Sequence, residues 1–236
     1  MKKKHIIIIV ILVVLIIGLI IYLNTYYKAS DVNGCLSDSE SIKVLKKEEF
    51  KGYLFDGPGE EKLLIFYPGA KVEYTAYAPI MNRIAQEGVD TLLIKMPFNI
   101  ALLDINAANK IIISNYKYDS YYLGGHSLGG VAAASYVNKF DPNDVKGLIL
   151  LASYSTKKID VPVLSIYGSN DKVLNNNKYE ENKKNIPNNV EVIIEGGNHA
   201  YFGNYGEQKG DGKATIEREE QQNKTVSEIV KFIKEN

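Results

Sequence analysis

The sequence has no tryptophan, a single cysteine and only three histidines among its 236 residues. The one cysteine, Cys35, excludes an internal disulfide and a cysteine-based metal cluster. The histidines are His5, His126 and His199, which lie far apart and lack the spacing of metal ligands. We therefore expect no metal site, and nothing else in the sequence calls for a cofactor.

The chain also lacks an excess of charge of either sign, because 28 basic and 28 acidic residues give a formal net charge of zero. No block of Lys or Arg recurs along the body of the chain. Since phosphate binding needs a concentrated basic face, we expect no nucleic-acid partner. A hydrophobic fraction of 45% supplies one sizeable core. A chain of 236 residues is too short for two domains of ordinary size.

The N-terminal segment has the pattern of a membrane anchor. Lysines occupy positions 2–4, and an unbroken apolar run of 18 residues follows at Ile6–Leu23. A helix of that length spans roughly 27 Å, close to the thickness of the bilayer core. Because basic residues concentrate before the run and only Lys28 closely follows it, we expect a cytoplasmic N-terminus. This predicts a single-pass protein of the cell membrane whose body lies on the extracytoplasmic side.

Two alternatives to an uncleaved anchor stay open. A cleavable signal peptide has a shorter apolar core of about 7–15 residues and a small-residue cleavage site, and residues 24–30 fit such a site poorly. Val32–Cys35 resembles a lipoprotein processing site in part, which would make Cys35 a lipidation site. Cys35 lies twelve residues beyond the apolar run, however, and Asn33 fits that motif poorly.

The rest of the chain divides into a polar stalk at residues 24–48 and a folded domain at residues 49–236, after the anchor at residues 1–23. In the domain, short apolar runs alternate with helical patterns, which predicts a mostly parallel sheet with helices on both faces. The expected strands are Gly52–Phe55, Leu63–Tyr67, Thr91–Met96, Tyr121–Gly124, Gly147–Leu151, Val163–Tyr167 and Val190–Ile194. The expected helices are Thr75–Gln86, Ile100–Ile113, Leu128–Asn138, Tyr179–Asn185 and Ile216–Lys234. We expect a chain without residues 1–30 to be soluble and active.

A Gly-x-Ser-x-Gly motif at Gly125–Gly129 carries the chemistry. An apolar strand leads into it and a helix leads out, so the chain must turn sharply and expose Ser127. Gly125 and Gly129 remove side chains that would collide where the strand and the helix pass closely. The motif predicts Ser127 as a nucleophile, which needs a base for activation.

Elimination identifies the base. His5 lies in the anchor, and His126 adjoins Ser127, so we expect its side chain to project away from the serine. His199 follows the last expected strand and remains as the base. Asp171 follows the preceding strand and is the expected carboxylate partner, since it would fix the tautomer of the histidine. Its competitors Asp144 and Asp160 precede strands and would lie at the opposite edge of the sheet.

Stabilisation of an oxyanion requires two backbone N–H donors. We expect one from Leu128, the residue after the nucleophile, and the other from Ala70, with Lys71 as the alternative. Lys71, Tyr201 and Phe202 are our candidates for contacts with the substrate. Only residues 152–162 join the expected strands Gly147–Leu151 and Val163–Tyr167, which is too few for a helical lid, so we expect an open site without a cap domain.

The loop Tyr67–Gly69, the motif at Gly125–Gly129, Asp171 and His199 together resemble the α/β-hydrolase superfamily. The resemblance covers residues from about 50 to 236 and is nearest to compact bacterial dienelactone hydrolases and carboxylesterases. It implies an α/β-hydrolase fold with the chain order Ser127, Asp171, His199. Dienelactone hydrolases use a cysteine nucleophile, so their substrate class does not carry over to a chain with Ser127.

The leading interpretation is a serine esterase that acts on a small-molecule ester or acyl substrate through an acyl-enzyme. Because the triad does not reveal the leaving group, a peptidase or amidase is the first alternative. A catalytically silent hydrolase fold that binds a ligand at the cell surface is the second, although a complete set of triad residues argues against it.

Overall fold

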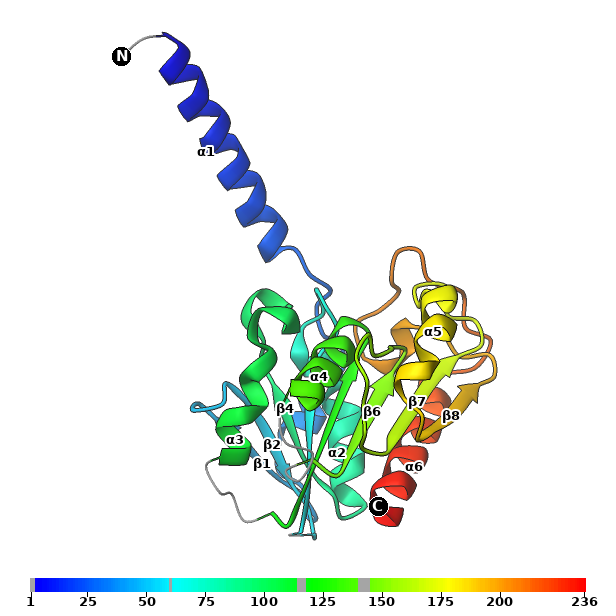
Figure 1. The fold of residues 1–236 in the computed structure, drawn as a ribbon. Helices are drawn as coiled ribbons and strands as arrows, with labels where there is room; N and C mark the ends of the chain where they lie inside the picture. Colours follow the sequence, from blue (N-terminus) through cyan, green and yellow to red (C-terminus); the bar gives the residue numbers. More distant parts are fainter. Residues whose placement is uncertain (1–2, 60, 114–117, 140–144) are drawn as a thin grey trace.

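An eight-stranded sheet organises the body of the computed structural model (Figure 1), which describes residues 3–59, 61–113, 118–139 and 145–236. The strand order is β1-β2-β4-β3-β5-β6-β7-β8. The pairs from β4 through β3 to β8 are parallel, and β1 and β2 are antiparallel to their neighbours. The strands are β1 (Lys43–Lys47), β2 (Gly52–Asp56), β3 (Lys62–Tyr67), β4 (Asp90–Ile94), β5 (Ser120–His126), β6 (Gly147–Leu151), β7 (Val163–Gly168) and β8 (Asn189–Ile194). The mostly parallel sheet expected from the sequence is confirmed. Two residues named in the sequence analysis, Lys2 and Asp144, lie outside the described residues.

The central strands are buried on both faces, which explains their continuous apolar sequences. Every residue of β4 and β6 is buried, as is all of β3 after Lys62. Strands covered on both faces need apolar side chains at successive positions rather than at alternate ones. The helices that provide this cover are α2 (Ala78–Gln86), α3 (Asn109–Ile113), α4 (Leu128–Lys139), α5 (Asn176–Asn182) and α6 (Arg218–Glu235).

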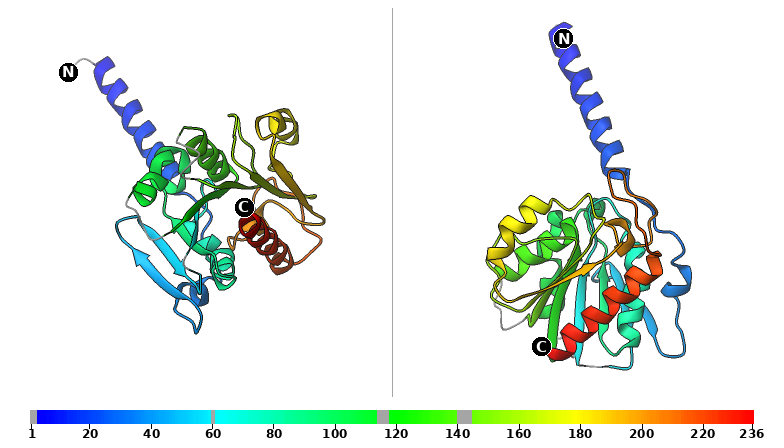
Figure 2. Two further views of the ribbon diagram at one scale, coloured as in Figure 1. Left: turned by 60° about the horizontal axis from the view of Figure 1, so that its bottom comes forward. Right: turned by 90° about the vertical axis from the view of Figure 1, so that its right-hand side faces the viewer.

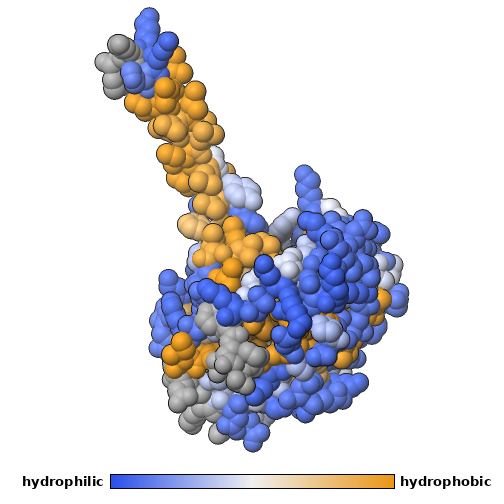
Figure 3. Space-filling view, in the orientation of Figure 1, coloured by the Kyte–Doolittle hydropathy of each residue, from blue (hydrophilic) through white to orange (hydrophobic). Residues whose placement is uncertain are grey.

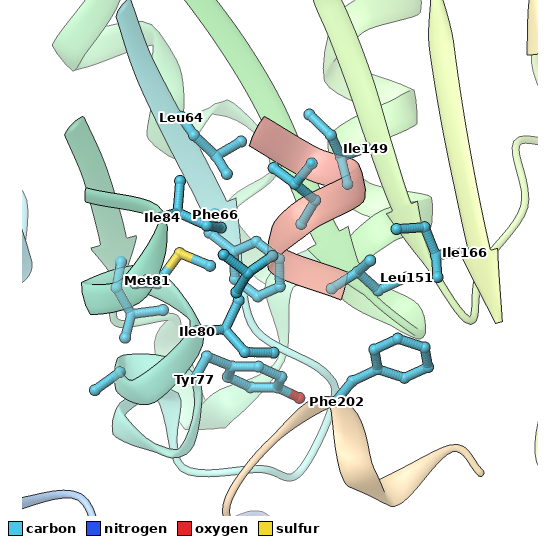
Figure 4. Close-up of a cluster of buried hydrophobic side chains, with 14 of the residues drawn as sticks. Leu64, Phe66, Tyr77, Ile80, Met81, Ile84, Ile149, Leu151, Ile166 and Phe202 are labelled. Atoms are coloured by element: carbon cyan, nitrogen blue, oxygen red, sulfur yellow. The ribbon is translucent and has the colours of Figure 1, made fainter. Parts of the chain in front are cut away.

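Two hydrophobic clusters lie on opposite faces of the sheet. One contains side chains of α2 and α6, including Ile80, Met81 and Ile229, and part of it is drawn in Figure 4. The other contains side chains of α3 and α4, including Ile111 and Ala133. The fold is therefore a three-layer α/β sandwich, as expected, and residues 152–162 between β6 and β7 contain no helix.

The segment after β4 is less regular than expected. Instead of one helix over Ile100–Ile113, the chain forms a 3-10 helix at Ala101–Ala108 and then the short α3. Asp104 interrupts the helical geometry with a φ of −146° and a ψ of 63°. A second short 3-10 helix, Pro97–Asn99, precedes this segment.

Instead of the expected polar stalk over residues 24–48, the segment from Tyr27 onward packs on the body. Lys43–Lys47 pairs with β2 as an edge strand, so the domain begins before residue 49. Val32 is 6% exposed and Ile42 is 1% exposed, and Tyr27 forms an isolated β-bridge with Val72. Isolated apolar residues anchor this segment, and its polar composition concealed them.

The apolar helix α1 (Lys3–Asn24) projects from the body without burying any residue against it (Figures 1 and 2). It is long and apolar enough to cross a membrane, as expected, and its surface is hydrophobic along nearly its whole length (Figure 3). A signal sequence would satisfy the same two criteria.

Candidate active site

Ser127 lies on a sharp turn between β5 and α4. Its backbone φ is 53°, a left-handed conformation that costs about 1–2 kcal/mol for a residue with a side chain. Two hydrogen bonds hold the turn: Ser127 N donates to the carbonyl of Leu151 at 2.9 Å, and Ser153 Oγ donates to the carbonyl of Ser127 at 2.7 Å. The left-handed backbone and these two hydrogen bonds together place the Ser127 side chain at the carboxyl end of β5.

The glycines of the motif allow this turn to pack closely. A Cβ atom on Gly125 would lie 2.5 Å from the carbonyl carbon of Gly129. A Cβ atom on Gly129 would lie 2.3 Å from the carbonyl oxygen of Tyr67 and 2.4 Å from that of Pro68. Any side chain at either position would push α4 away from the strand or from the loop after β3.

His199 and Asp171 form a buried hydrogen-bonded pair from the loops after β8 and β7. His199 Nδ1 lies 2.8 Å from Asp171 Oδ2, and both side chains are 1% exposed. Asp171 Oδ1 accepts hydrogen bonds from the amides of Val173 and Leu174, each at 2.8 Å. An ionised carboxylate held in this way favours a proton on Nδ1 and leaves Nε2 free to accept one.

Asp211, a residue that the sequence reasoning did not select, joins the two loops that carry this pair. Its Oδ2 accepts from the amide of Ala200 at 2.9 Å, and its Oδ1 accepts from the amide of Lys172 at 3.3 Å. Each of these amides belongs to the residue directly after His199 or Asp171. The only signal in the sequence was the position of Asp211 in the long loop after β8.

Ser127 and His199 line the same small cavity, whose volume is about 160 Å³. Its walls are largely apolar, with Leu128, Val131, Ala152, Val173 and Leu174 among the lining residues. His199 Nε2 is buried and has no hydrogen-bond partner in the described part of the chain. The cavity therefore combines a partly exposed serine, an unpaired basic nitrogen and an apolar wall.

A larger cavity of about 490 Å³ lies elsewhere, beside β1, β2 and the segment after β4. Its lining contains no serine, cysteine or histidine. Within the described ranges, no group of three or more His, Cys, Asp or Glu residues could hold a metal ion. We therefore place the candidate chemistry in the smaller cavity, where the nucleophile and the base occur together.

Two backbone amides, one directly after Ser127 and one in the loop that packs against the start of α4, have no acceptor among the described residues. They belong to Leu128, at the start of α4, and to Ala70, in the loop after β3. The alternative donor, Lys71, is engaged, since its amide donates to the carbonyl of Asn99 at 2.8 Å. This arrangement favours Ala70 over Lys71 as the second donor to an oxyanion.

A second buried histidine lies beside the base. The ring centroid of His126 lies 4.4 Å from that of His199, so the histidine set aside in the elimination packs directly against the candidate base. Burial, and secondarily His199, hold the pKa of His126 well below its ordinary value. Its Nδ1 lies 2.8 Å from the hydroxyl of Tyr77, which accepts from the amide of Gly69 at 3.1 Å. Burial raises the pKa of Tyr77, so the hydroxyl stays protonated and is a hydrogen-bond donor to His126 Nδ1 in the tautomer that carries the imidazole proton on Nε2.

The three candidates for substrate contacts do not line the cavity. Phe202 is fully buried in the core cluster with Tyr77 (Figure 4). Its ring packs against that of His126, with 5.6 Å between the centroids. The ring of Tyr201 instead faces the guanidinium of Arg218 at 5.1 Å. The Lys71 side chain donates hydrogen bonds to the carbonyls of Tyr22 and Leu23 at the end of α1.

Comparisons with known proteins agree with this geometry. Residues 63–223 match the model of the "Alpha/beta hydrolase family". No curated protein sequence matches the chain. Among solved structures, Est1E from Butyrivibrio proteoclasticus is 15% identical with a TM-score of 0.60, and the match covers 83% of this chain and 98% of that one.

Two further esterases have similar folds. Esterase 2 of Thermogutta terrifontis, in a form phosphoramylated by tabun, is 12% identical with a TM-score of 0.59, covering 83% of this chain and 96% of its own. The Pyrobaculum calidifontis esterase is 15% identical with a TM-score of 0.58, covering 86% and 88%. At these identities the likeness concerns the fold alone.

Proposed function

The chain belongs to the alpha/beta hydrolase family, and on that premise we propose that it is a serine hydrolase that cleaves carboxylic esters. One observation carries the proposal. The 2.8 Å hydrogen bond between His199 and Asp171 leaves His199 Nε2 unpaired in the same cavity as Ser127. These are the parts that activate a hydroxyl for attack on an acyl carbon.

The first half of the reaction forms an acyl-enzyme. Ser127 Oγ attacks the carbonyl carbon of the ester while His199 Nε2 takes its proton, and Asp171 stabilises the resulting imidazolium. The oxyanion of the tetrahedral intermediate receives hydrogen bonds from the amides of Leu128 and Ala70, each worth about 3–4 kcal/mol. The imidazolium then protonates the leaving alkoxide, and the C–O bond of the ester breaks.

The second half releases the acid. His199 Nε2 removes a proton from a water molecule as the water oxygen attacks the acyl carbon. The bond between the acyl carbon and Ser127 Oγ then breaks, and the imidazolium returns the proton to Oγ. The strand-end position of the cavity supports the entry of water, since no helix between β6 and β7 covers it.

We further propose that α1 anchors the enzyme in the cell membrane, with lysines on the cytoplasmic side and the body on the other. The apolar length of α1 and the lysines that precede it support this arrangement.

Labelling with a fluorophosphonate probe tests the nucleophile, because the probe needs an activated serine. The detergent-solubilised protein should be labelled at Ser127, and Ser127→Ala should lose both labelling and hydrolysis of p-nitrophenyl esters without a lower melting temperature. Ser135→Ala is the matched control, since Ser135 lies on α4 outside the cavity and its hydroxyl donates to the carbonyl of Val131 within that helix, and its variant should still be labelled at Ser127. Equal labelling of Ser127→Ala and wild type would overturn the proposal. Comparing p-nitrophenyl esters with aminoacyl-anilides separates an esterase from a peptidase.

A further inference from the structure

The end of α1 and the candidate active site share one loop, the residues that follow β3. On one side this loop packs against the start of α4, where Gly129 has no room for a Cβ atom beside Tyr67 and Pro68. On the other side its Lys71 binds the last carbonyls of α1. Ala70, the proposed oxyanion donor, is the residue between these two contacts. The anchor therefore ends beside the catalytic centre.

The topology agrees with these contacts. In a parallel sheet the loops after the strands gather at one edge, and Ser127, Asp171 and His199 follow β5, β7 and β8. The helix α1 leaves the body from this same edge and points away from it in all three views (Figures 1 and 2). A membrane spanned by α1 would consequently lie over the catalytic edge rather than over the opposite edge.

Exposed apolar side chains occur at this edge as well. Phe98, Leu102 and Leu103 are 53%, 40% and 57% exposed, and they lie in the segment after β4. This segment is joined to the anchor's loop, because the carbonyl of Asn99 accepts from the amide of Lys71. Figure 3 shows hydrophobic surface that continues from α1 onto the adjoining part of the body.

The backbone at Phe98 adds a second observation. Phe98 and Asn99 have φ values of 50° and 55°, a left-handed conformation that is unusual for a bulky residue. Such strain persists where a surrounding structure requires it. Here the turn is held by the hydrogen bond from the amide of Lys71 to the carbonyl of Asn99. The Phe98 ring, which is 53% exposed and forms part of the lining of the larger cavity, is available to an apolar phase outside the protein.

We propose that the catalytic edge rests on the membrane that α1 spans, and that the substrate is an ester of an amphiphile held in that membrane. The inference rests on the serine hydrolase and the anchor proposed above. Phe98, Leu102 and Leu103 enter the interfacial layer of the bilayer. The apolar cavity walls, with Val131, Val173 and Leu174, receive the acyl chain as it leaves the lipid layer.

Tryptophan fluorescence tests the membrane contact directly, since the chain has no tryptophan of its own. Phe98→Trp creates a single reporter at the proposed contact. Val190→Trp is its matched control: Val190 is also 53% exposed, but it lies near the start of β8, toward the opposite edge. In phosphatidylcholine vesicles with brominated acyl chains, we expect the full-length Phe98→Trp protein to be blue-shifted and quenched and the Val190→Trp protein to be unaffected. Equal quenching of the two proteins, or quenching of neither, would overturn the proposed orientation.

Hydrolysis tests the substrate class. The probes are 4-methylumbelliferyl oleate dispersed in the vesicle bilayer and soluble 4-methylumbelliferyl butyrate, both with the full-length protein in vesicles. Replacing Phe98 and Leu103 by Gln should lower the rate on the oleate by about tenfold or more, because it weakens the seating of the edge on the lipid. The same variant should hydrolyse the butyrate within about twofold of wild type, and Val190→Gln should match wild type on both esters.

An unchanged rate of the double variant on the bilayer-resident ester would refute the substrate class. An equal loss on both esters would also refute it, since that pattern indicates damage to the site. If the wild-type protein hydrolysed neither ester, the proposed function would fail together with the substrate class, while the quenching measurement would still decide the membrane contact.

Discussion

Asp171 has a separate task for each of its carboxylate oxygens. One oxygen accepts from the amides of Val173 and Leu174 and thereby fixes the loop, and the other accepts from His199. In Asp171→Asn the amide group can keep the loop contacts only by turning its NH₂ toward His199 Nδ1. The histidine would then carry its proton on Nε2, where it cannot act as a base.

We expect Asp171→Asn to lower kcat for a soluble ester by a factor on the order of 10³–10⁴, slightly less than His199→Ala does. Steady-state kinetics with p-nitrophenyl butyrate measure both losses. Asp160→Asn is the control, because Asp160 is an exposed residue paired with Lys158 and should retain wild-type activity. Full activity of Asp171→Asn would show that the histidine does not depend on this carboxylate.

His126 predicts a dependence of stability on pH. Its pKa in the folded protein is held well below the ordinary value of about 6.5 by burial and by His199. Below about pH 6.5 the unfolded chain therefore binds a proton that the folded chain does not, and stability falls as the pH falls. The slope contributed by one such residue is about 1.4 kcal/mol per pH unit.

We expect His126→Asn to remove that contribution, while its side-chain oxygen preserves an acceptor for the Tyr77 hydroxyl. Urea unfolding at pH 7.5 and pH 5 should show a smaller loss of stability in the variant than in wild type. Other titrating groups are common to both proteins and cancel in the comparison. An identical pH dependence would mean that His126 is protonated without penalty in the folded protein.

The sequence predicted the residues whose roles follow from local pattern and chain order. Ser127 was identified by its glycines and by the strand and helix around it, and His199 and Asp171 by their positions after successive strands. Tyr77 and Asp211 could not be predicted in the same way. Their hydrogen bonds connect residues 49 and 39 positions apart, so only the folded chain brings the partners together.

At the scale of elements, the segment between the anchor and β2 was the least predictable part of the fold. An edge strand needs little apolar sequence, and β1 has three exposed residues out of five. The residues just after α1 also pair with the body, since Tyr27 N donates to the carbonyl of Lys71 at 2.7 Å and Glu73 N donates to the carbonyl of Tyr27 at 2.8 Å. These two bonds stabilise the loop that carries Ala70.

Two truncations separate the role of α1 as an anchor from a structural role of residues 25–30, which pair with the body. A chain that lacks residues 1–24 keeps the pairing of Tyr27, and we expect it to be soluble with near wild-type kcat/KM on a soluble ester. A chain that lacks residues 1–30 loses this pairing and the bonds of Ala29 to Glu73 and of Ser30 to Asn204. We expect a kcat/KM about three- to tenfold lower and a reduced melting temperature, at about 1 kcal/mol for each lost hydrogen bond. Equal kcat/KM and equal melting temperatures of the two truncated chains would contradict a structural role for residues 25–30.

For the whole molecule, the absence of a helix between β6 and β7 predicts simple kinetics once the anchor is removed. Without a lid that must open at an interface, the chain that lacks residues 1–24 should follow Michaelis behaviour toward short soluble esters. Its rate should not rise sharply above the critical micelle concentration of the substrate. Rate measurements across that concentration check the expectation, and a sudden increase would contradict it.

The short connection between α1 and the body also limits rotation. Only Thr25 and Tyr26 separate the end of α1 at Asn24 from the bridge at Tyr27. A flexible stalk of 25 residues would let the body tumble over roughly 25–30 Å, whereas two residues span about 7 Å. With α1 in the membrane as proposed, the body would reorient with it as one unit and meet substrate by lateral diffusion in two dimensions, so its encounter rate would depend on how much substrate occupies each unit of membrane area.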